Sequence, residues 1–166
     1  MDKALQAALD YVPQYLDFQM RASLQPGCSV AIAHKGKVVF ERAYGFANAI
    51  TGAELTPRHR FRVASHSKTF TAAGIMKLRE AGKLKLDDRA GEHVQGLHGE
   101  VARATIAQLL SHTAGIIRDG TDSGQWVDRR PFLSEEELRA ALAQKPVLQT
   151  SARFKYSNHG FGLLGL

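Results

Sequence analysis

Cysteine is almost absent from this sequence, whose single copy is Cys28. One cysteine cannot form an internal disulfide, so we expect the fold to be held together without one. The seven histidines show no spacing typical of metal ligands, and no cysteine lies near a pair of them in the sequence. The sequence therefore predicts no zinc site or other bound metal, and no cofactor.

Long apolar runs are also lacking. No stretch of about eighteen apolar residues occurs, so we expect no membrane-spanning helix and no membrane partner. The first residues, Met1 to Leu5, do not join a basic segment to a purely apolar one, as a secretory signal does. We therefore expect a cytoplasmic protein.

A basic run interleaved with aromatic residues is missing as well. The net charge is +6, from 22 lysines and arginines against 16 acidic residues, but the basic residues are scattered along the chain. Nucleic-acid binding is therefore not expected. Hydrophobic residues make up 44% of the 166 positions, which is ordinary for a soluble globular protein and excludes extensive disorder.

The first forty residues predict a helix followed by a β-hairpin. Apolar side chains recur at helical spacing from Lys3 to Met20, and Pro13 interrupts them, so we expect a kinked or two-part helix. Two short apolar runs, at residues 30–32 and 38–40, then flank a Lys-Gly pair at 35–36. This pattern predicts two strands joined by a tight turn.

The rest of the chain predicts loops and helices. Residues 51–61 are polar and are expected to form a loop that leads to a helix ended by Gly82. Residues 118–130 are expected to form a second, long loop that contains the only tryptophan and could border a pocket. The apolar positions that support the helix before Gly82 are Phe70, Ala73, Met76 and Leu78.

Three further helices are predicted from their ends. Thr105 is expected to cap a short helix through Leu110, and Ser134 with Glu137 forms a capping box for a helix that reaches about Gln144. Residues 157–166 begin an apolar helix with no polar closing turn, which should continue or pack against something.

One serine of the nine, Ser65, stands three residues before a lysine, Lys68, at the start of a predicted helix. This spacing puts both side chains on one face of the helix. A serine hydroxyl beside an amine that can give up its proton is a known way to make a nucleophile without a Ser-His-Asp triad. The pair therefore favours a serine acyl-transfer enzyme, although an exposed pair on a surface helix has the same spacing.

Two further motifs follow this pair in a fixed order. Residues 109–116 read Leu-Leu-Ser-His-Thr-Ala-Gly-Ile, and residues 154–160 read Phe-Lys-Tyr-Ser-Asn-His-Gly. Together with Ser65 and Lys68, these segments resemble the serine β-lactamase and penicillin-binding protein family, and most of all its class C, D-aminopeptidase and esterase branch. The resemblance runs from about residue 25 to residue 166.

The resemblance implies an α+β fold, in which helices flank a mainly antiparallel sheet and a helical region is added. Residues 1–166 would be the N-terminal portion of one serine-hydrolase domain. Within it, residues 1–64 are expected to form the N-terminal helix and the first hairpin of the sheet. Residues 65–166 are expected to form a mainly helical region that carries the Ser-x-x-Lys and Tyr-x-Asn motifs.

The resemblance also implies roles for individual residues. Ser65 would be the nucleophile, Lys68 and Tyr156 would transfer protons, and Asn158 would bind Lys68 and the carbonyl region of the substrate. A free phenol titrates near pH ~10, so Tyr156 needs neighbouring ammonium groups to act near neutral pH. Lys68 and Tyr156 would titrate as a coupled pair, and the sequence does not decide which of them holds the proton. Asn158 could instead cap the following helix, and His112 is expected to make structural hydrogen bonds.

The chain departs from the family in length and in one motif. Relatives in this branch run to well over twice its length and carry Lys-Thr-Gly or His-x-Gly on a later strand, whereas no such triplet follows Tyr156. That strand normally supplies a second oxyanion donor beside the backbone N–H of Ser65, so the chain alone offers an incomplete site. We therefore expect a C-terminal half of the same fold, present as a second chain or lost. Residues 149–152 also replace the usual Pro-Gly turn with Gln-Thr-Ser-Ala.

The sequence thus predicts a serine hydrolase that forms an acyl-Ser65 intermediate with a carboxylic ester or a small amide or peptide, and passes the acyl group to water. Esters and small amides are favoured over β-lactams because a cytoplasmic protein is not expected to act on cell walls or antibiotics. Three alternatives remain: a β-lactam-hydrolysing or D-amino-acid peptidase activity, a non-catalytic penicillin-binding-like module, and a fragment that assembles with a second chain.

Overall fold

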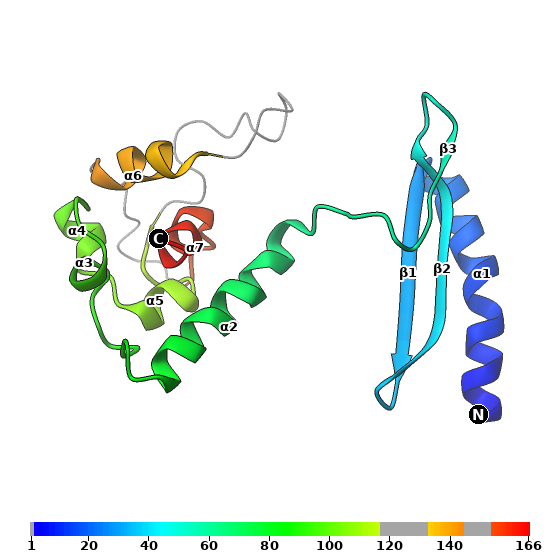
Figure 1. Ribbon diagram of the computed structural model, residues 1–166, viewed down its shortest axis with the longest axis horizontal. Coiled ribbons are helices and arrows are strands. Elements are labelled where there is room, and N and C mark those ends of the chain that lie inside the picture. The colour runs from blue at the N-terminus through cyan, green and yellow to red at the C-terminus, as the bar shows by residue number, and fades with distance from the viewer. Residues whose placement is uncertain (1, 117–132, 145–153) are drawn as a thin grey trace. The chain divides into compact units, whose positions relative to one another are not determined.

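The computed structural model describes residues 2–116, 133–144 and 154–166 (Figure 1). They divide into two compact units, Met1–Arg62 and Val63–Leu166. The expected loop around Trp126 and the altered turn at 149–152 lie outside the described residues.

The first unit begins with one long helix, α1 (Lys3–Ser23). It ends at Leu24, which is in the left-handed conformation (φ 53°) and whose backbone N–H donates to the Met20 carbonyl. Pro13 lies inside the helix and does not divide it, so the two-part alternative is wrong. A proline removes one backbone donor, at a cost of about 3 kcal/mol. The other backbone hydrogen bonds of this 21-residue helix keep it continuous across Pro13.

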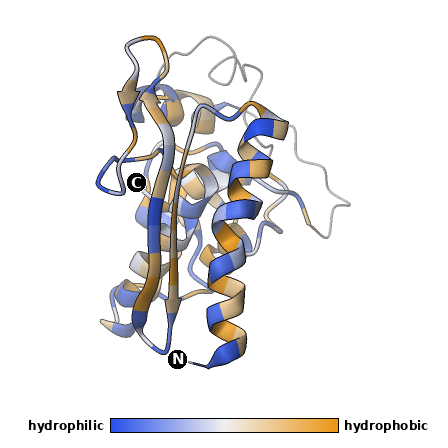
Figure 2. Ribbon diagram, turned by 90° about the vertical axis from the view of Figure 1, so that its right-hand side faces the viewer, coloured by the Kyte–Doolittle hydropathy of each residue, from blue (hydrophilic) through white to orange (hydrophobic). Residues whose placement is uncertain are grey.

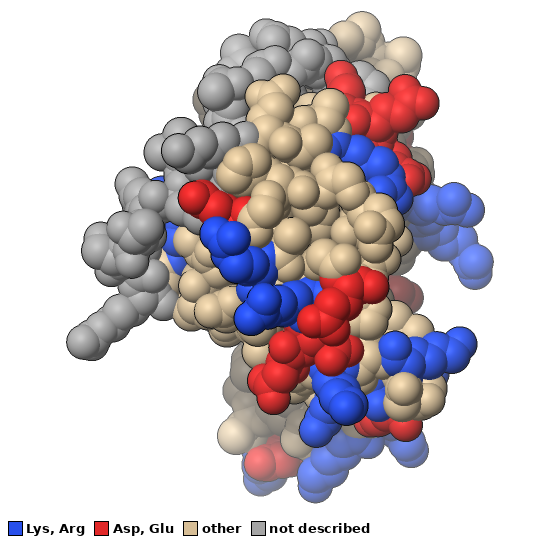
Figure 3. Space-filling model, turned by 90° about the vertical axis from the view of Figure 1, so that its left-hand side faces the viewer, with Lys and Arg blue, Asp and Glu red and all other residues tan. Residues whose placement is uncertain are grey.

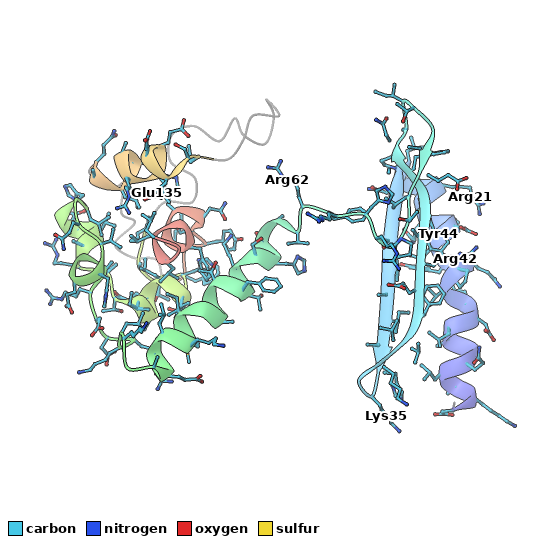
Figure 4. All side chains as sticks on the ribbon, viewed as in Figure 1. Arg21, Lys35, Arg42, Tyr44, Arg62 and Glu135 are labelled. Carbon is cyan, nitrogen blue, oxygen red and sulfur yellow. The ribbon has the colours of Figure 1, made fainter. Side chains whose placement is uncertain are left out.

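Strands β1 (Gly27–His34) and β2 (Lys37–Asn48) form the predicted antiparallel hairpin. The turn between them has positive φ at both central residues, 49° at Lys35 and 76° at Gly36. This backbone twist matches that of the flanking strands, which is why Lys-Gly between two apolar runs predicted the turn. Lys35 marks the turn in Figure 4.

A third strand lies where the sequence predicted only a loop. Strand β3 (Ala53–Glu54) pairs antiparallel with the end of β2, so the strand order is β1-β2-β3. The polar composition of residues 51–61 hides this short strand because backbone pairing to β2, and not burial, defines it. Among the described strands β1 is therefore an edge, with one side open to further pairing.

The first unit buries little apolar surface of its own. Helix α1 runs alongside the hairpin (Figures 1 and 2), and Leu9 is the one apolar side chain among the described residues of this unit that is buried, at 7% exposure. Tyr11 and Phe18 of the same helix stay exposed. On β2 the guanidinium of Arg42 lies 5.1 Å from the centre of the Tyr44 ring, a cation–π contact (Figure 4).

The second unit starts with a 3₁₀ turn, η1 (Ala64–His66), that leads into α2 (Ser67–Glu80). As predicted, Gly82 ends this helix: it is left-handed (φ 69°), and the next backbone N–H returns to the Leu78 carbonyl at 2.9 Å. Among the apolar positions that predicted this helix, Phe70 is 75% exposed, and the buried residue of the helix is Ile75. Helix α2 therefore buries only a narrow side in this unit.

Five shorter helices follow α2 among the described residues of the second unit. The structure confirms Thr105 as an N-cap and Ser134 with Glu137 as a capping box, and it shows that Gln108 completes a capping box with Thr105 as well. The last helix packs against α2, α5 and α6, and its Leu163 is buried, so the apolar end of the chain packs within its own unit. The five helices are α3 (Ala90–His93), α4 (Gly99–Ala102), α5 (Ile106–Leu110), α6 (Glu135–Ala143) and α7 (Asn158–Leu164).

The hydrophobic core of the described chain lies in this second unit. Its buried residues are Ile75, Leu84, Ala90, Val101, Ala104, Ile106, Leu109, Ile116, Leu142, Leu163 and Leu164.

The surface shown in Figure 3 is charged, with acidic and basic side chains interspersed. None of the described helices combines the length and the apolar character that crossing a membrane requires.

Candidate active site

Ser65 lies in the 3₁₀ turn directly before α2, where its side chain is exposed. The residue before it, Ala64, has a positive φ of 44°, which is rare for a residue with a Cβ and costs on the order of 1 kcal/mol. The turn closes with a 3.0 Å hydrogen bond from the His66 N–H to the Val63 carbonyl. This strained turn presents the Ser65 hydroxyl at the entrance to the helix, where a substrate can reach it.

The structure brings all four predicted site residues together. Ser65 Oγ and Tyr156 Oη are hydrogen-bonded at 2.5 Å, although 91 residues separate them in the chain. Lys68 Nζ donates to Asn158 Oδ1 at 2.6 Å. The 3₁₀ turn with Ser65 and the helix with Lys68 thus each form one short side-chain hydrogen bond to the segment at the start of α7. Both distances are typical of strong hydrogen bonds.

Lys68 also contacts two aromatic rings. Its Nζ lies 4.8 Å from the centre of the Tyr156 ring and 5.7 Å from that of Phe161. Lys68 is half-buried. The faces of the two rings and the Asn158 oxygen all attract its ammonium group. The ammonium group is held beside the Ser65 and Tyr156 pair by these contacts.

Ser157, between the two motif residues, caps α7. Its Oγ accepts a hydrogen bond from the Gly160 N–H at 2.8 Å. The alternative that Asn158 caps this helix is therefore wrong, because Asn158 is the first helical residue and its Oδ1 accepts from Lys68. The cap fixes the start of α7 and so the direction in which Asn158 leaves the backbone.

His112 contacts the segment of residues 155–157 and makes the structural hydrogen bonds that the sequence predicted. Its carbonyl accepts from the Lys155 N–H at 2.7 Å, and its Nδ1 accepts from the Ser157 N–H at 3.1 Å. Its ring centre lies 4.5 Å from that of Tyr156 and 4.9 Å from that of Phe161. Burial, and then the nearby charge of Lys68, lower the pKa of His112 below its ordinary value.

The described residues offer no site for a metal ion. Within residues 2–116, 133–144 and 154–166 no group of three or more His, Cys, Asp or Glu side chains is placed to hold one. His66, next to the candidate nucleophile, faces back to the Val63 carbonyl at 3.2 Å from its Nδ1.

Comparison with known proteins gives one family match over most of the chain. The family model described as Beta-lactamase matches residues 14–166. Protein flp of Staphylococcus aureus (strain COL) is 32% identical over 145 residues, which cover 85% of this chain and 29% of that protein. The chain therefore spans less than a third of the length of this curated relative.

Two solved structures are similar over nearly the whole chain. One, described as a class C beta-lactamase, has a TM-score of 0.76 and 29% identity, covering 94% of this chain and 42% of that one. The other, a beta-lactamase/D-alanine carboxypeptidase from Pseudomonas syringae, has a TM-score of 0.72 and 25% identity, covering 95% and 43%. Each of these structures has more than twice the extent of the matched region.

Proposed function

Because the chain belongs to the Beta-lactamase family, we propose that Ser65 is the nucleophile of a serine hydrolase that works through an acyl-enzyme. The fold is that of class C β-lactamases and penicillin-binding protein homologues, and the chain covers part of it. The single observation that carries the proposal is the 2.5 Å hydrogen bond between Ser65 Oγ and Tyr156 Oη. A base within hydrogen-bonding distance is what a serine hydroxyl needs in order to attack a carbonyl.

In the first half of the reaction, Tyr156 acts as a phenolate. Ser65 Oγ forms a bond to the substrate carbonyl carbon, the π electrons of the carbonyl move to its oxygen, and the Ser65 proton passes to the Tyr156 phenolate oxygen. Lys68 supplies positive charge beside this pair, which favours the phenolate. Asn158 holds the Lys68 ammonium and can also donate to the substrate through its amide N–H groups. The backbone N–H of Ser65, at the entrance to α2, stabilises the developing oxyanion.

Collapse of the tetrahedral intermediate breaks the bond to the leaving group, which takes the proton back from Tyr156 and departs as an alcohol or amine. Water then attacks the acyl-Ser65 carbonyl, and Tyr156 accepts the proton of the water. The second collapse releases the carboxylic acid and returns the proton to Ser65 Oγ. Each bond that forms is matched by one that breaks, and no cofactor takes part.

We propose carboxylic esters or small amides as the substrates. Ser65 is exposed, so a small, reactive acyl substrate can approach its hydroxyl from solvent, and this supports the proposal. A second candidate is a β-lactam or a peptide ending in a D-amino acid, and the beta-lactamase and D-alanine carboxypeptidase among the similar structures support it. A non-catalytic module that kept the fold would instead be acylated once without turnover.

We also propose that the working enzyme includes a C-terminal half of the same fold, and that residues 1–64 and 65–166 are two parts of its N-terminal portion. The share of the relatives that the chain spans supports this proposal, since it is 29% of Protein flp and 42% of the class C beta-lactamase. The later strand of the family would add the second oxyanion donor. Below, the completed protein means this chain together with that half.

Labelling with a fluorophosphonate tests the nucleophile directly. The completed protein is expected to gain one adduct, which peptide mapping places on Ser65, because the adjacent base activates that hydroxyl. Ser65→Ala should abolish the adduct. Ser67→Ala is the matched control, since Ser67 is also exposed and lies two residues away, and it should label like the wild type. An adduct on Ser67, or unchanged labelling of Ser65→Ala, contradicts the assignment.

A further inference from the structure

His112 contacts the segment that carries Tyr156 on both sides of that residue. Its carbonyl accepts from the N–H of Lys155 at 2.7 Å, and its Nδ1 accepts from the N–H of Ser157 at 3.1 Å. Its ring lies against the Tyr156 ring with centres 4.5 Å apart and planes inclined by 30°. The backbone before and after Tyr156, and the ring itself, are therefore held by one residue 44 positions earlier in the chain.

We propose that His112, as a neutral ring, is a positioning residue that holds Tyr156 and Asn158 opposite Ser65 and Lys68. The proposal rests on the proposed function, because it assigns His112 no contact with substrate and no step of its own. Its effect passes through the segment of residues 155–158. Displacing that segment lengthens both hydrogen bonds of the site, the one between Ser65 and Tyr156 and the one from Lys68 to Asn158.

The hydrogen bond from Ser157 fixes the protonation state of the ring. Because His112 Nδ1 accepts from a backbone N–H, it must carry a lone pair, and the ring proton sits on Nε2. A protonated ring has an N–H at both nitrogens and would face the Ser157 N–H with another donor. The arrangement in the structure therefore requires neutral His112.

Charges around the ring favour the same state. Among the described residues, the titratable groups that face it are Lys68 from α2 and Tyr156 from the segment before α7, while α7 itself presents the uncharged Phe161. Phe154 adds a further uncharged ring, 5.6 Å away centre to centre. Burial, followed by the positive charge of Lys68, lowers the pKa of His112 from its ordinary 6.5.

The sign of the pH effect follows from this direction. Between the folded pKa of His112 and 6.5, the unfolded chain binds more protons than the folded one. The contribution of neutral His112 to stability is therefore complete above pH 6.5 and is lost as the pH falls through the folded pKa. Acidification through the folded pKa of His112 should also lower acylation, because protonation of the ring breaks the contact that holds the Tyr156 segment.

Two substitutions separate the hydrogen bond from the ring contact. His112→Asn keeps an acceptor close to the Nδ1 position, cannot be protonated, and suits the left-handed backbone at this residue (φ 58°). His112→Phe keeps an aromatic ring against Tyr156 and loses the acceptor. We expect kcat/KM to fall by about a hundredfold in His112→Phe, the effect of misplacing a reacting group by about 1 Å, and only a few-fold in His112→Asn.

The test measures kcat/KM of the completed protein against pH for the wild type and both variants, together with ¹⁵N NMR of the histidine rings. The wild type should show His112 as the Nε2–H tautomer, with an acid limb in kcat/KM at the pH where His112 titrates. His112→Asn should lose that limb and keep most activity near neutral pH. A merely structural role would lower the melting temperature of the variants and leave the limb in place.

Three results would overturn the inference. These are a His112→Phe variant with wild-type kcat/KM, an acid limb that survives in His112→Asn, and a His112 ring that NMR shows protonated at Nδ1 near neutral pH. A wild type that neither hydrolyses esters nor labels at Ser65 would contradict the proposed function itself, and this inference with it. Wild-type labelling and turnover that the His112 variants leave unchanged would contradict the positioning role alone.

Discussion

Turnover of the completed protein is expected to fall by about a hundredfold to ten-thousandfold when Tyr156 is replaced by phenylalanine, the usual contribution of a general acid–base group. The substitution removes only the oxygen that is hydrogen-bonded to Ser65 Oγ. The ring contacts with His112 and Lys68 remain, so the free energy of unfolding should change by no more than about 1 kcal/mol. Steady-state ester hydrolysis and thermal unfolding measure the two effects separately.

Tyr11→Phe provides the control for this experiment. Tyr11 is an exposed tyrosine of α1, so loss of its hydroxyl should leave turnover unchanged. Near-normal turnover in Tyr156→Phe would rule out the proton-transfer role of Tyr156. A large fall in melting temperature together with the loss of turnover would instead assign Tyr156 to packing.

Residues 1–166 expressed alone are expected to give an aggregating or poorly folded, inactive product. The first unit buries only Leu9 among its described apolar side chains, while Val38 and Ile50 stay exposed. Strand β1 is an edge of the described sheet, and an open edge invites pairing with another chain. A sheet this small needs further strands or a covering layer for stability.

The proposed C-terminal half would also add a second oxyanion donor, which contributes about a hundredfold to a thousandfold in turnover. The apolar end of α7 is not a further reason to expect a C-terminal half, because Leu163 and Leu164 are already buried in the second unit. Adding the C-terminal half should recover soluble protein and ester hydrolysis. Monomeric 166-residue protein that unfolds cooperatively and hydrolyses esters would show the expectation to be wrong.

Elements with strong local signals were predictable from the sequence. The turn at Lys35 and Gly36, and the capping boxes that begin at Thr105 and Ser134, each follow from side chains within a few residues. Such signals act through backbone conformation and short-range hydrogen bonds, so they do not depend on the rest of the fold. Gly82 ended α2 where expected for the same reason.

Predictions that depended on tertiary contacts were less accurate. The apolar positions of residues 70–78 predicted a helix but not its buried side: Phe70 is exposed and Ile75 is buried, and α2 packs against α7. Strand β3 went unpredicted because it has only two residues, both exposed, and only its pairing with β2 defines it. Pro13 does not divide α1 in two, since a long helix tolerates one lost backbone hydrogen bond.

The candidate site also combines residues that a local pattern could pair with residues that only the fold brings together. The spacing of Ser65 and Lys68 was enough to place them together, because both lie within one helical turn. Tyr156 and Asn158 could be assigned only through the resemblance to a family, since nothing in the spacing brings residues 90 positions apart into contact. The hydrogen bond from Ser157 to His112 spans 45 positions, and no signal in the sequence shows that His112 holds the Tyr156 segment.

The most direct test of a nucleophilic Ser65 is the mass of the acyl-enzyme. The completed protein is mixed with a slowly hydrolysed ester, quenched in acid during turnover, digested and analysed by mass spectrometry. The account predicts that the peptide containing Ser65 gains the mass of the acyl group, that the adduct disappears as substrate is exhausted, and that Ser65→Ala never forms it. Turnover without any adduct on Ser65, or an acyl group on another residue, would contradict the account.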